Sequence, residues 1–173
     1  MNPLWDGPYG MVLMGWFNKL FRRSADSDDP AEAAVLKREL AEREKELGPD
    51  HPNVTPCLDN LAELYKTHGR YAQAEALYQR ALAIREKSLG PDHPAVAQSL
   101  NYLAMLYRTQ NQYAQAESFF KHSLAIKEKA LGPDHPSVAA SLEHMAKLYW
   151  KMGRDDEAKS LEQRAAAIRA IKR

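Results

Sequence analysis

The hexapeptide Leu-Gly-Pro-Asp-His-Pro occurs three times in this chain, at residues 47–52, 89–94 and 131–136. Both intervals between copies are 42 residues. The similarity extends beyond the hexapeptide, because alignment of residues 51–92 with 93–134 gives 23 identities in 42 positions. A fixed period of this length is typical of repeat proteins, whose units stack on one another and bury a shared core. The repeat therefore predicts an elongated stack of similar units.

Each unit contains two stretches with helical periodicity. In the first unit, one apolar face is formed by Val54, Leu58, Leu61, Ala62 and Tyr65. A second and broader apolar face is formed by Ala74, Leu77, Tyr78, Ala81, Leu82, Ile84 and Leu89. No segment alternates with a period of two, so we predict an all-α fold. The predicted helices cover about 30–47, 53–68, 71–88, 95–110, 113–130, 137–152 and 155–171.

Residues that favour turns separate the predicted helices. The break within each unit falls at Gly69, Asn111 and Gly153, and these residue types tolerate a left-handed backbone. The hexapeptide lies between units, where its glycine and proline are expected to end one helix. Its aspartate, Asp50 in the first copy, is predicted to cap the next helix. Its histidine, His51 in the first copy, recurs once per unit, so the three histidines cannot converge on one metal ion and are predicted to be structural.

These residues resemble the signature of the tetratricopeptide repeat family. The matching residues of the first unit are Leu61, Ala62, Tyr65, Gly69, Tyr71, Ala74, Tyr78 and Ala81. The 42-residue length and the hexapeptide are similar, more narrowly, to the repeats of kinesin light chains and their bacterial look-alikes. The resemblance covers about residues 30–173. It implies a right-handed α-solenoid of helix hairpins, in which the first helix of each hairpin lines the concave side.

The repeats also predict how the chain is organised. An N-terminal segment at 1–29 precedes a repeat domain at 30–173. The domain is predicted to comprise a half repeat at 30–50 and full repeats at 51–92, 93–134 and 135–173.

Composition and motifs exclude several functions. The chain has 24 Lys and Arg against 23 Asp and Glu, and this balance argues against nucleic-acid binding, which needs a strongly basic face. The single cysteine, Cys57, cannot form an intramolecular disulfide, and we expect a buried, inert thiol in a cytoplasmic protein. The sequence contains no zinc-protease motif, phosphate-binding loop or serine elbow. We therefore predict a chain that is not an enzyme and needs no cofactor or metal.

The predicted binding surface is the groove side of the first helices. The residues assigned to it are Asn60, Glu63, Lys66, Asn101, Tyr102, Met105, Arg108, His144, Lys147 and Trp150. These positions differ between repeats whereas core positions are alike, which indicates that something other than packing shapes them. Asn60 and Asn101 can pair with a peptide backbone, and the aromatic and methionine side chains can contact apolar residues. The basic residues favour an acidic partner. We therefore predict binding of an extended peptide or partner segment.

The N-terminal segment contains a second candidate site. A helix at about 11–23 would place Leu13, Trp16, Phe17, Leu20 and Phe21 on one face, beside Lys19, Arg22 and Arg23. An acidic linker follows. Three interpretations stay open. The helix packs on residues 30–47, lies in a membrane interface at the inner face of a membrane, or serves as an autoinhibitory plug or an oligomer contact. The alternatives to a peptide-binding module are therefore a membrane-tethered scaffold and an accessory subunit of an enzyme complex.

Overall fold

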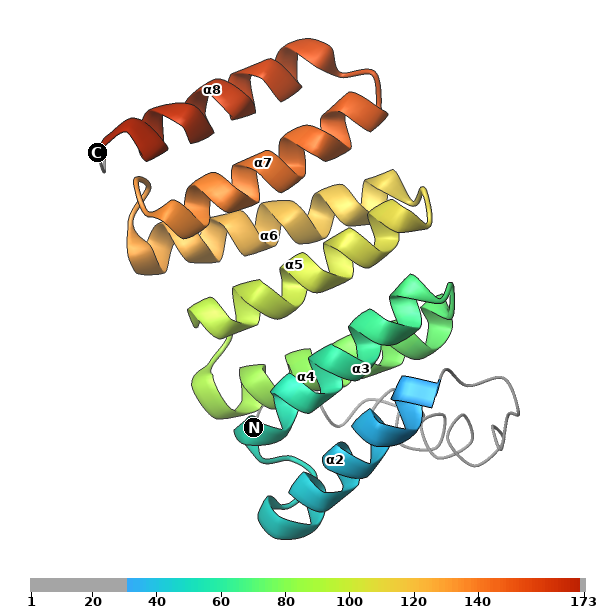
Figure 1. Ribbon diagram of the computed structural model, residues 1–173. Helices are drawn as coiled ribbons and strands as arrows, with labels where there is room; N and C mark the ends of the chain where they lie inside the picture. The colour runs from blue at the N-terminus through green and yellow to red at the C-terminus, as the bar shows by residue number, and fades with distance from the viewer. Residues whose placement is uncertain (1–30, 172–173) are drawn as a thin grey trace, which may run out of the picture.

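The computed structural model describes residues 31–171, and all regular secondary structure in this part of the chain is helical (Figure 1). The elements are α2 (Ala31–Leu47), η1 (Pro52–Val54), α3 (Thr55–Thr67), α4 (Tyr71–Leu89), α5 (Pro94–Thr109), α6 (Tyr113–Leu131), α7 (Pro136–Lys151) and α8 (Asp155–Ile171). Each of the seven helices predicted between residues 30 and 171 is present, with ends that differ from the prediction by at most two residues. The prediction of an all-α fold is confirmed.

Each helix packs against the next one in the chain. The closest associations are within the hairpins α3–α4, α5–α6 and α7–α8. These hairpins stack in order, from α2 at one end of the molecule to α8 at the other (Figure 1). The first helices α5 and α7 also contact each other directly. The structure is therefore the predicted right-handed α-solenoid, with three hairpins preceded by a half repeat.

The core of the stack combines small alanines with large side chains. Ala62, Ala74 and Ala81 are fully buried, and their small side chains let neighbouring helices approach closely. Tyr65 and Tyr78 fill the space between these contacts, with only 1% of each exposed. Burial of one such large side chain contributes about 2–3 kcal/mol. The repeated core positions are thus explained by packing alone.

The turns within the hairpins adopt the predicted backbone conformation. The φ angles of Gly69, Asn111 and Gly153 are 74°, 60° and 71°. The amide of the following residue then bonds back into the first helix, as when Arg70 N donates to Tyr65 O at 2.8 Å. The left-handed residue therefore closes the αα-hairpin, as the sequence predicts.

The cap of each first helix differs from the prediction. The histidine of the hexapeptide, not the aspartate, is the N-cap: His93 Nδ1 accepts a hydrogen bond from Ala95 N at 3.1 Å. His93 has the extended backbone of an N-cap residue (φ −78°, ψ 141°), and Asp92 lies one residue too early to reach the free amides. Asp92 instead forms an ion pair with Lys129. His135 caps α7 in the same way through Ser137 N at 3.1 Å. In the first repeat, His51 caps η1, the short 3-10 helix directly before α3, through Asn53 N at 3.2 Å.

The predicted N-terminal segment at 1–29, including its helix at about 11–23, lies outside the described residues. The proposals for Leu13, Trp16, Phe17, Leu20 and Phe21 therefore stay predictions. Within residues 31–171, no helix combines the length and apolar character that crossing a membrane would require.

Candidate partner-binding surface

The outward side chains of α3, α5 and α7 form a surface that we call the first-helix face. Each of these helices buries its other side in the core, through Leu61, Leu103 and Met145 at equivalent positions. Nine of the ten residues predicted for the binding surface are exposed or half-buried on this face. These nine are Asn60, Glu63, Lys66, Tyr102, Met105, Arg108, His144, Lys147 and Trp150.

Asn101 is the exception, because only 7% of this residue is exposed. Its Nδ2 donates to Met105 Sδ at 3.5 Å, and its Oδ1 lies 3.2 Å from His144 Nδ1. The residue equivalent to Asn101 in the first repeat is Asp59, which precedes Asn60 by one position. Asn101 is therefore not the equivalent of Asn60, and its side chain turns inward. The expectation that Asn60 and Asn101 present matching amides to a peptide is therefore wrong for Asn101.

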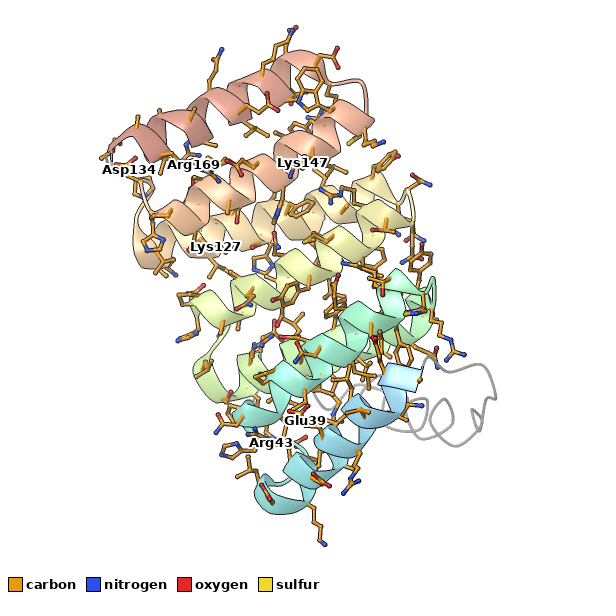
Figure 2. All side chains as sticks on the ribbon, in the orientation of Figure 1. Glu39, Arg43, Lys127, Asp134, Lys147 and Arg169 are labelled. Carbon is orange, nitrogen blue, oxygen red and sulfur yellow. The ribbon has the colours of Figure 1, made fainter. Side chains whose placement is uncertain are left out.

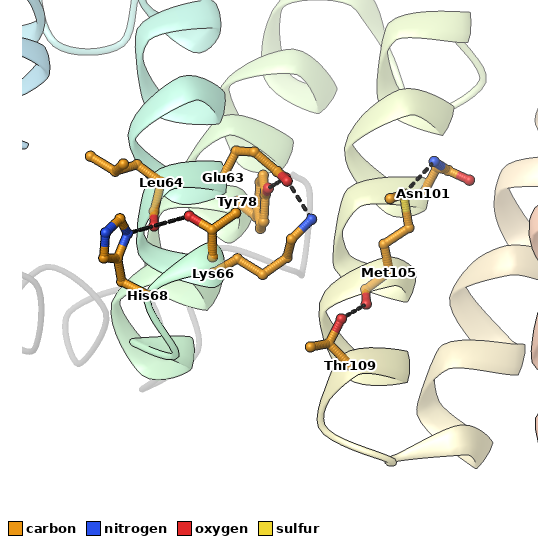
Figure 3. A network of polar contacts seen from close by, with 9 residues as sticks. Glu63, Leu64, Lys66, His68, Tyr78, Asn101, Met105 and Thr109 are labelled. Atoms are coloured by element: carbon orange, nitrogen blue, oxygen red, sulfur yellow. Dashed lines mark hydrogen bonds and ion pairs between the residues drawn. The ribbon is translucent and has the colours of Figure 1, made fainter. Parts of the chain in front are cut away.

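In the first repeat, an acidic residue on this face is already paired. Glu63 Oε2 accepts hydrogen bonds from Lys66 Nζ at 2.6 Å and from Tyr78 Oη at 2.8 Å (Figure 3). Burial opposes ionisation of Glu63, but the bonds from Lys66 and Tyr78 outweigh it and lower the pKa of this carboxyl group. The charge of Lys66 is therefore largely balanced within its own helix.

In the second repeat, the face is mainly aromatic and apolar. The ring of Tyr102 stacks on Tyr78, with centroids 5.4 Å apart. Gln98 Nε2 donates to Tyr102 Oη at 2.7 Å and fixes the direction of the phenol. Met105 is half-buried beside them, and its carbonyl accepts from the Thr109 hydroxyl at 2.9 Å (Figure 3). This part of the face can contact apolar side chains of a partner.

In the third repeat, Trp150 is 40% exposed, which is unusual for so large a side chain. Its Nε1 donates to Glu162 Oε1 of α8 at 2.8 Å. Lys159 Nζ lies 6.0 Å from the ring centroid. The indole is therefore held in one orientation while keeping apolar surface available.

Positive charge gathers between α5 and α7. Arg108 Nη1 donates to the carbonyl oxygen of His144 at 3.5 Å, and burial lowers the pKa of Arg108. Burial also lowers the pKa of His144, and the cations Arg108, Lys147 and Lys127 lower it further. The neutral form of His144 is therefore favoured, and the positive charge of this region comes from Arg108, Lys127 and Lys147.

One contributor to this charge, Lys127 of α6, is absent from the predicted surface. Lys127 is half-buried, and its Nζ donates to Ser141 Oγ of α7 at 2.7 Å. Burial lowers the pKa of Lys127. Lys127 and Lys147 are both labelled in Figure 2. The prediction considered only first helices, whereas Lys127 belongs to a second helix and contacts the first helix α7 through Ser141.

Cys57 shows no feature of a reactive thiol. The side chain is buried, and its Sγ lies 3.7 Å from Glu39 Oε1. Burial, reinforced by the negative charge of Glu39, raises the pKa of Cys57. Elsewhere in residues 31–171, no three His, Cys, Asp or Glu side chains are grouped in a way that could hold a metal ion.

The fold and this surface define a helical repeat protein whose stacked hairpins present a varied face of first helices. The family profile described as the nephrocystin-3 TPR domain matches residues 78–173, and a tetratricopeptide repeat profile matches residues 57–95. The chain therefore belongs to the tetratricopeptide repeat family, and it is of the kinesin light chain-like type. Tetratricopeptide repeats generally mediate protein–protein interactions and are typically non-catalytic scaffolds.

Solved structures of related repeats agree with this assignment. Kinesin light chain TPR-like repeats from Podospora anserina are 25% identical, with a TM-score of 0.66 over 94% of this chain and 86% of that one. A substituted variant of the same repeats gives a TM-score of 0.67 at 25% identity, over 94% and 85% of the two chains. BtubC (BKLC) from P. vanneervenii has the same fold, with 23% identity and a TM-score of 0.73 over 81% of this chain. The match spans 56% of the BtubC chain. No curated protein sequence is significantly similar.

Proposed function

We propose that this chain is a non-enzymatic scaffold that binds an extended peptide segment of a partner protein along the first-helix face. The observation that carries the proposal is the contrast between two sets of equivalent positions. The core position of Ala62 is alanine in all three repeats, whereas the outward neighbour is Glu63, Met105 and Lys147 in turn. Packing explains the uniform position but not the variable one.

The chemistry of the face suits a peptide of mixed character. From α3 to α7 it offers a paired acidic group at Glu63, an aromatic and apolar area at Tyr102 and Met105, and the exposed Lys147 and Trp150. Packed helices lie about 8–10 Å apart, and an extended chain advances about 3.3 Å per residue. Two such intervals separate the three first helices, so a segment of roughly five to six residues would cross them.

Selection of peptides from a random library tests this proposal. The full chain is immobilised, a displayed library of random 12-residue peptides is enriched on it, and dissociation constants of the selected peptides are measured. The variant Asn60→Ala/Met105→Ala/Trp150→Ala removes three side chains of the first-helix face. We expect it to bind at least about tenfold more weakly, because aromatic and apolar anchors dominate such interfaces.

The matched control is Ser118→Ala/His122→Ala/Gln163→Ala, which removes three exposed side chains from the second helices α6 and α8. We expect this control to bind the peptides as tightly as the wild type. Failure to enrich any peptide, or equal affinity of all three proteins, would overturn the proposed function.

A further inference from the structure

An acid–base pair recurs at equivalent positions of the first and third repeats. In the first repeat, Arg85 Nη2 of α4 lies 2.6 Å from Asp59 Oδ2 of α3. In the third repeat, Arg169 Nη2 of α8 lies 2.7 Å from Glu143 Oε1 of α7. Each pair joins the second helix of a hairpin to its first helix. The cation at this position of the repeat therefore normally has a carboxylate partner.

The middle repeat has the cation but not the carboxylate. Lys127 occupies the position of Arg85 and Arg169, whereas the position of Asp59 and Glu143 is the uncharged Asn101. Lys127 Nζ has a hydrogen bond to Ser141 Oγ at 2.7 Å. Among residues 31–171, no carboxylate forms an ion pair with Lys127. This half-buried ammonium group thus lacks the counter-charge that its equivalents have.

Two further cations share this lack of a partner. Neither Arg108 of α5 nor Lys147 of α7 forms an ion pair with any carboxylate of the described part of the chain. Both lie close enough to His144 to act on its charge, as does Lys127. The acid that also acts on His144 is Glu143, and it is already bound to Arg169. The region between α5 and α7 is therefore a concentration of uncompensated positive charge.

This arrangement favours one kind of ligand. A cation that is partly removed from water is unfavourable unless an anion or several hydrogen bonds compensate it. The first and third repeats provide that anion as a side-chain carboxylate. In the second repeat the uncharged carboxamide of Asn101 occupies that position, so the anion has to come from another molecule. A carboxylate from outside would meet more than one cation here, because Lys127 binds Ser141 of α7, Arg108 binds the carbonyl of His144 one turn further along α7, and Lys147 also acts on His144.

We propose that Arg108, Lys127 and Lys147 form a binding site for one carboxylate group of the partner peptide. The proposal rests on the proposed function and makes it more specific, because it gives the peptide an obligatory acidic residue opposite the gap between α5 and α7. The partner then completes in the second repeat the ion pair that the first and third repeats form internally.

The first experiment uses the peptides selected on the wild-type chain. Each is synthesised in three forms: unchanged, with its acidic residues changed singly to the corresponding amide, and with an amidated C-terminus. We expect one side-chain substitution to weaken binding about tenfold, as for loss of a desolvated charge pair. Loss on C-terminal amidation instead would identify the chain terminus as the source of the carboxylate and would also support the site.

Three variants assign the carboxylate to its site. We expect Lys127→Met and Asn101→Asp each to weaken binding of the acidic peptide about tenfold. Asn101→Asp does so because it supplies an internal carboxylate that competes with that of the peptide. The control Lys129→Met removes the same charge from the same helix, but at a residue that pairs with Asp92, and should leave affinity unchanged. In Lys127→Met, the amide form of the peptide should bind no more weakly than the acidic form.

A second probe separates failure of this inference from failure of the proposed function. N-acetylglutamate N-methylamide, with the neutral glutamine analogue as its control, is titrated into the ¹⁵N-labelled full chain. Saturable shifts of the amides near Lys127 and His144, absent in Asn101→Asp, would support the site even if no peptide were enriched. Enriched peptides without an essential carboxylate, together with no shift from this probe, would overturn the site and leave peptide binding intact.

Discussion

Arg85 and Asp59 form a two-pronged ion pair, with Nη2–Oδ2 and Nη1–Oδ1 distances of 2.6 and 3.4 Å. Their side chains are only 9% and 11% exposed. Arg85 Nη1 also donates to Ser99 Oγ of α5, so one guanidinium joins α4 to α3 and to the next hairpin.

Removal of the acid from this pair should destabilise the protein. We expect Asp59→Asn to lower the free energy of unfolding by about 2 kcal/mol, because it leaves a buried guanidinium without a counter-charge. Urea denaturation at pH 7 measures the change. The control Asp50→Asn breaks an exposed pair with Lys87 at 3.3 Å and should change the free energy by less than about 0.5 kcal/mol. Equal effects would contradict the role given to burial.

The capping histidines make a second prediction. His93→Ala removes the acceptor for Ala95 N and should destabilise the fold by about 1 kcal/mol, whereas His93→Asn should retain most of the stability because asparagine is a good N-cap. Thermal and urea denaturation of both variants test this. The exposed His122 of α6 provides the control, since His122→Ala should be neutral. A destabilised His93→Asn would show that the histidine acts in some other way.

The glycines in the turns and between the repeats should respond differently to substitution. Gly90 has φ 84° and ψ 158°, a region that essentially only glycine occupies, so Gly90→Asn should cost about 1–3 kcal/mol. Gly69 has φ 74°, and its equivalent Asn111 already adopts φ 60°. Gly69→Asn should therefore change the free energy of unfolding by less than about 1 kcal/mol. An added Cβ would meet no atom within 4 Å at either glycine, so urea denaturation compares backbone conformation alone.

Glu117 of α6 should make the stability depend on acidic pH. Burial opposes its ionisation, but hydrogen bonds from Lys121, Arg154 and Tyr149 lower the pKa of Glu117 from 4.5 to about 2. Because the pKa of the folded state is the lower one, the stabilisation is present above about pH 4.5 and is lost as the pH falls towards 2. The bonds from Arg154 Nη1 and Tyr149 Oη are both 2.9 Å long and tie α6 to the last hairpin.

Denaturation of Glu117→Gln at two pH values tests this dependence. We expect the variant to be about 1 kcal/mol less stable than the wild type at pH 7 and closer to it at pH 3. Glu42→Gln serves as the control, because Glu42 forms an exposed pair with Arg38 in which the side chains are 61% and 83% exposed. A constant difference between Glu117→Gln and the wild type across this range would contradict the assignment.

The helices were predictable because each depends on local spacing, which three copies repeat. The caps were not, since the choice between Asp92 and His93 depends on which residue has the extended backbone, a shift of one position. Asn101 was assigned to the surface because a helix face drawn from one sequence is about one residue uncertain. Alignment pairs Asn101 with Asp59, 42 residues earlier, but only the structure shows that Asp59 turns inward to pair with Arg85.

Lys127 was missed for a different reason. Its ammonium group extends from α6 to Ser141 of α7. A contact between helices of two different hairpins depends on tertiary packing and cannot be read from the spacing within one helix. The repeats nevertheless contain a signal. Arg85, Lys127 and Arg169 are equivalent positions, as are Asp59, Asn101 and Glu143, and the second set lacks an acid only in the middle repeat. When the basic residue of a pair is kept in every repeat but its acidic partner is replaced in one repeat, the basic residue of that repeat has lost its internal ion pair.

This relationship makes a last prediction, about the stability of the protein without a ligand. Asn101→Asp should raise the free energy of unfolding by about 1 kcal/mol, because it gives Lys127 the partner that Arg85 and Arg169 already have. The control Asn60→Asp adds the same charge on an exposed part of α3 and should give no gain. Both are measured by urea denaturation at pH 7. The same substitution, Asn101→Asp, is expected to weaken binding of an acidic peptide. Asparagine at this position would therefore lower stability but leave Lys127 available to the peptide. A loss of stability in Asn101→Asp would show instead that Lys127 needs no counter-charge.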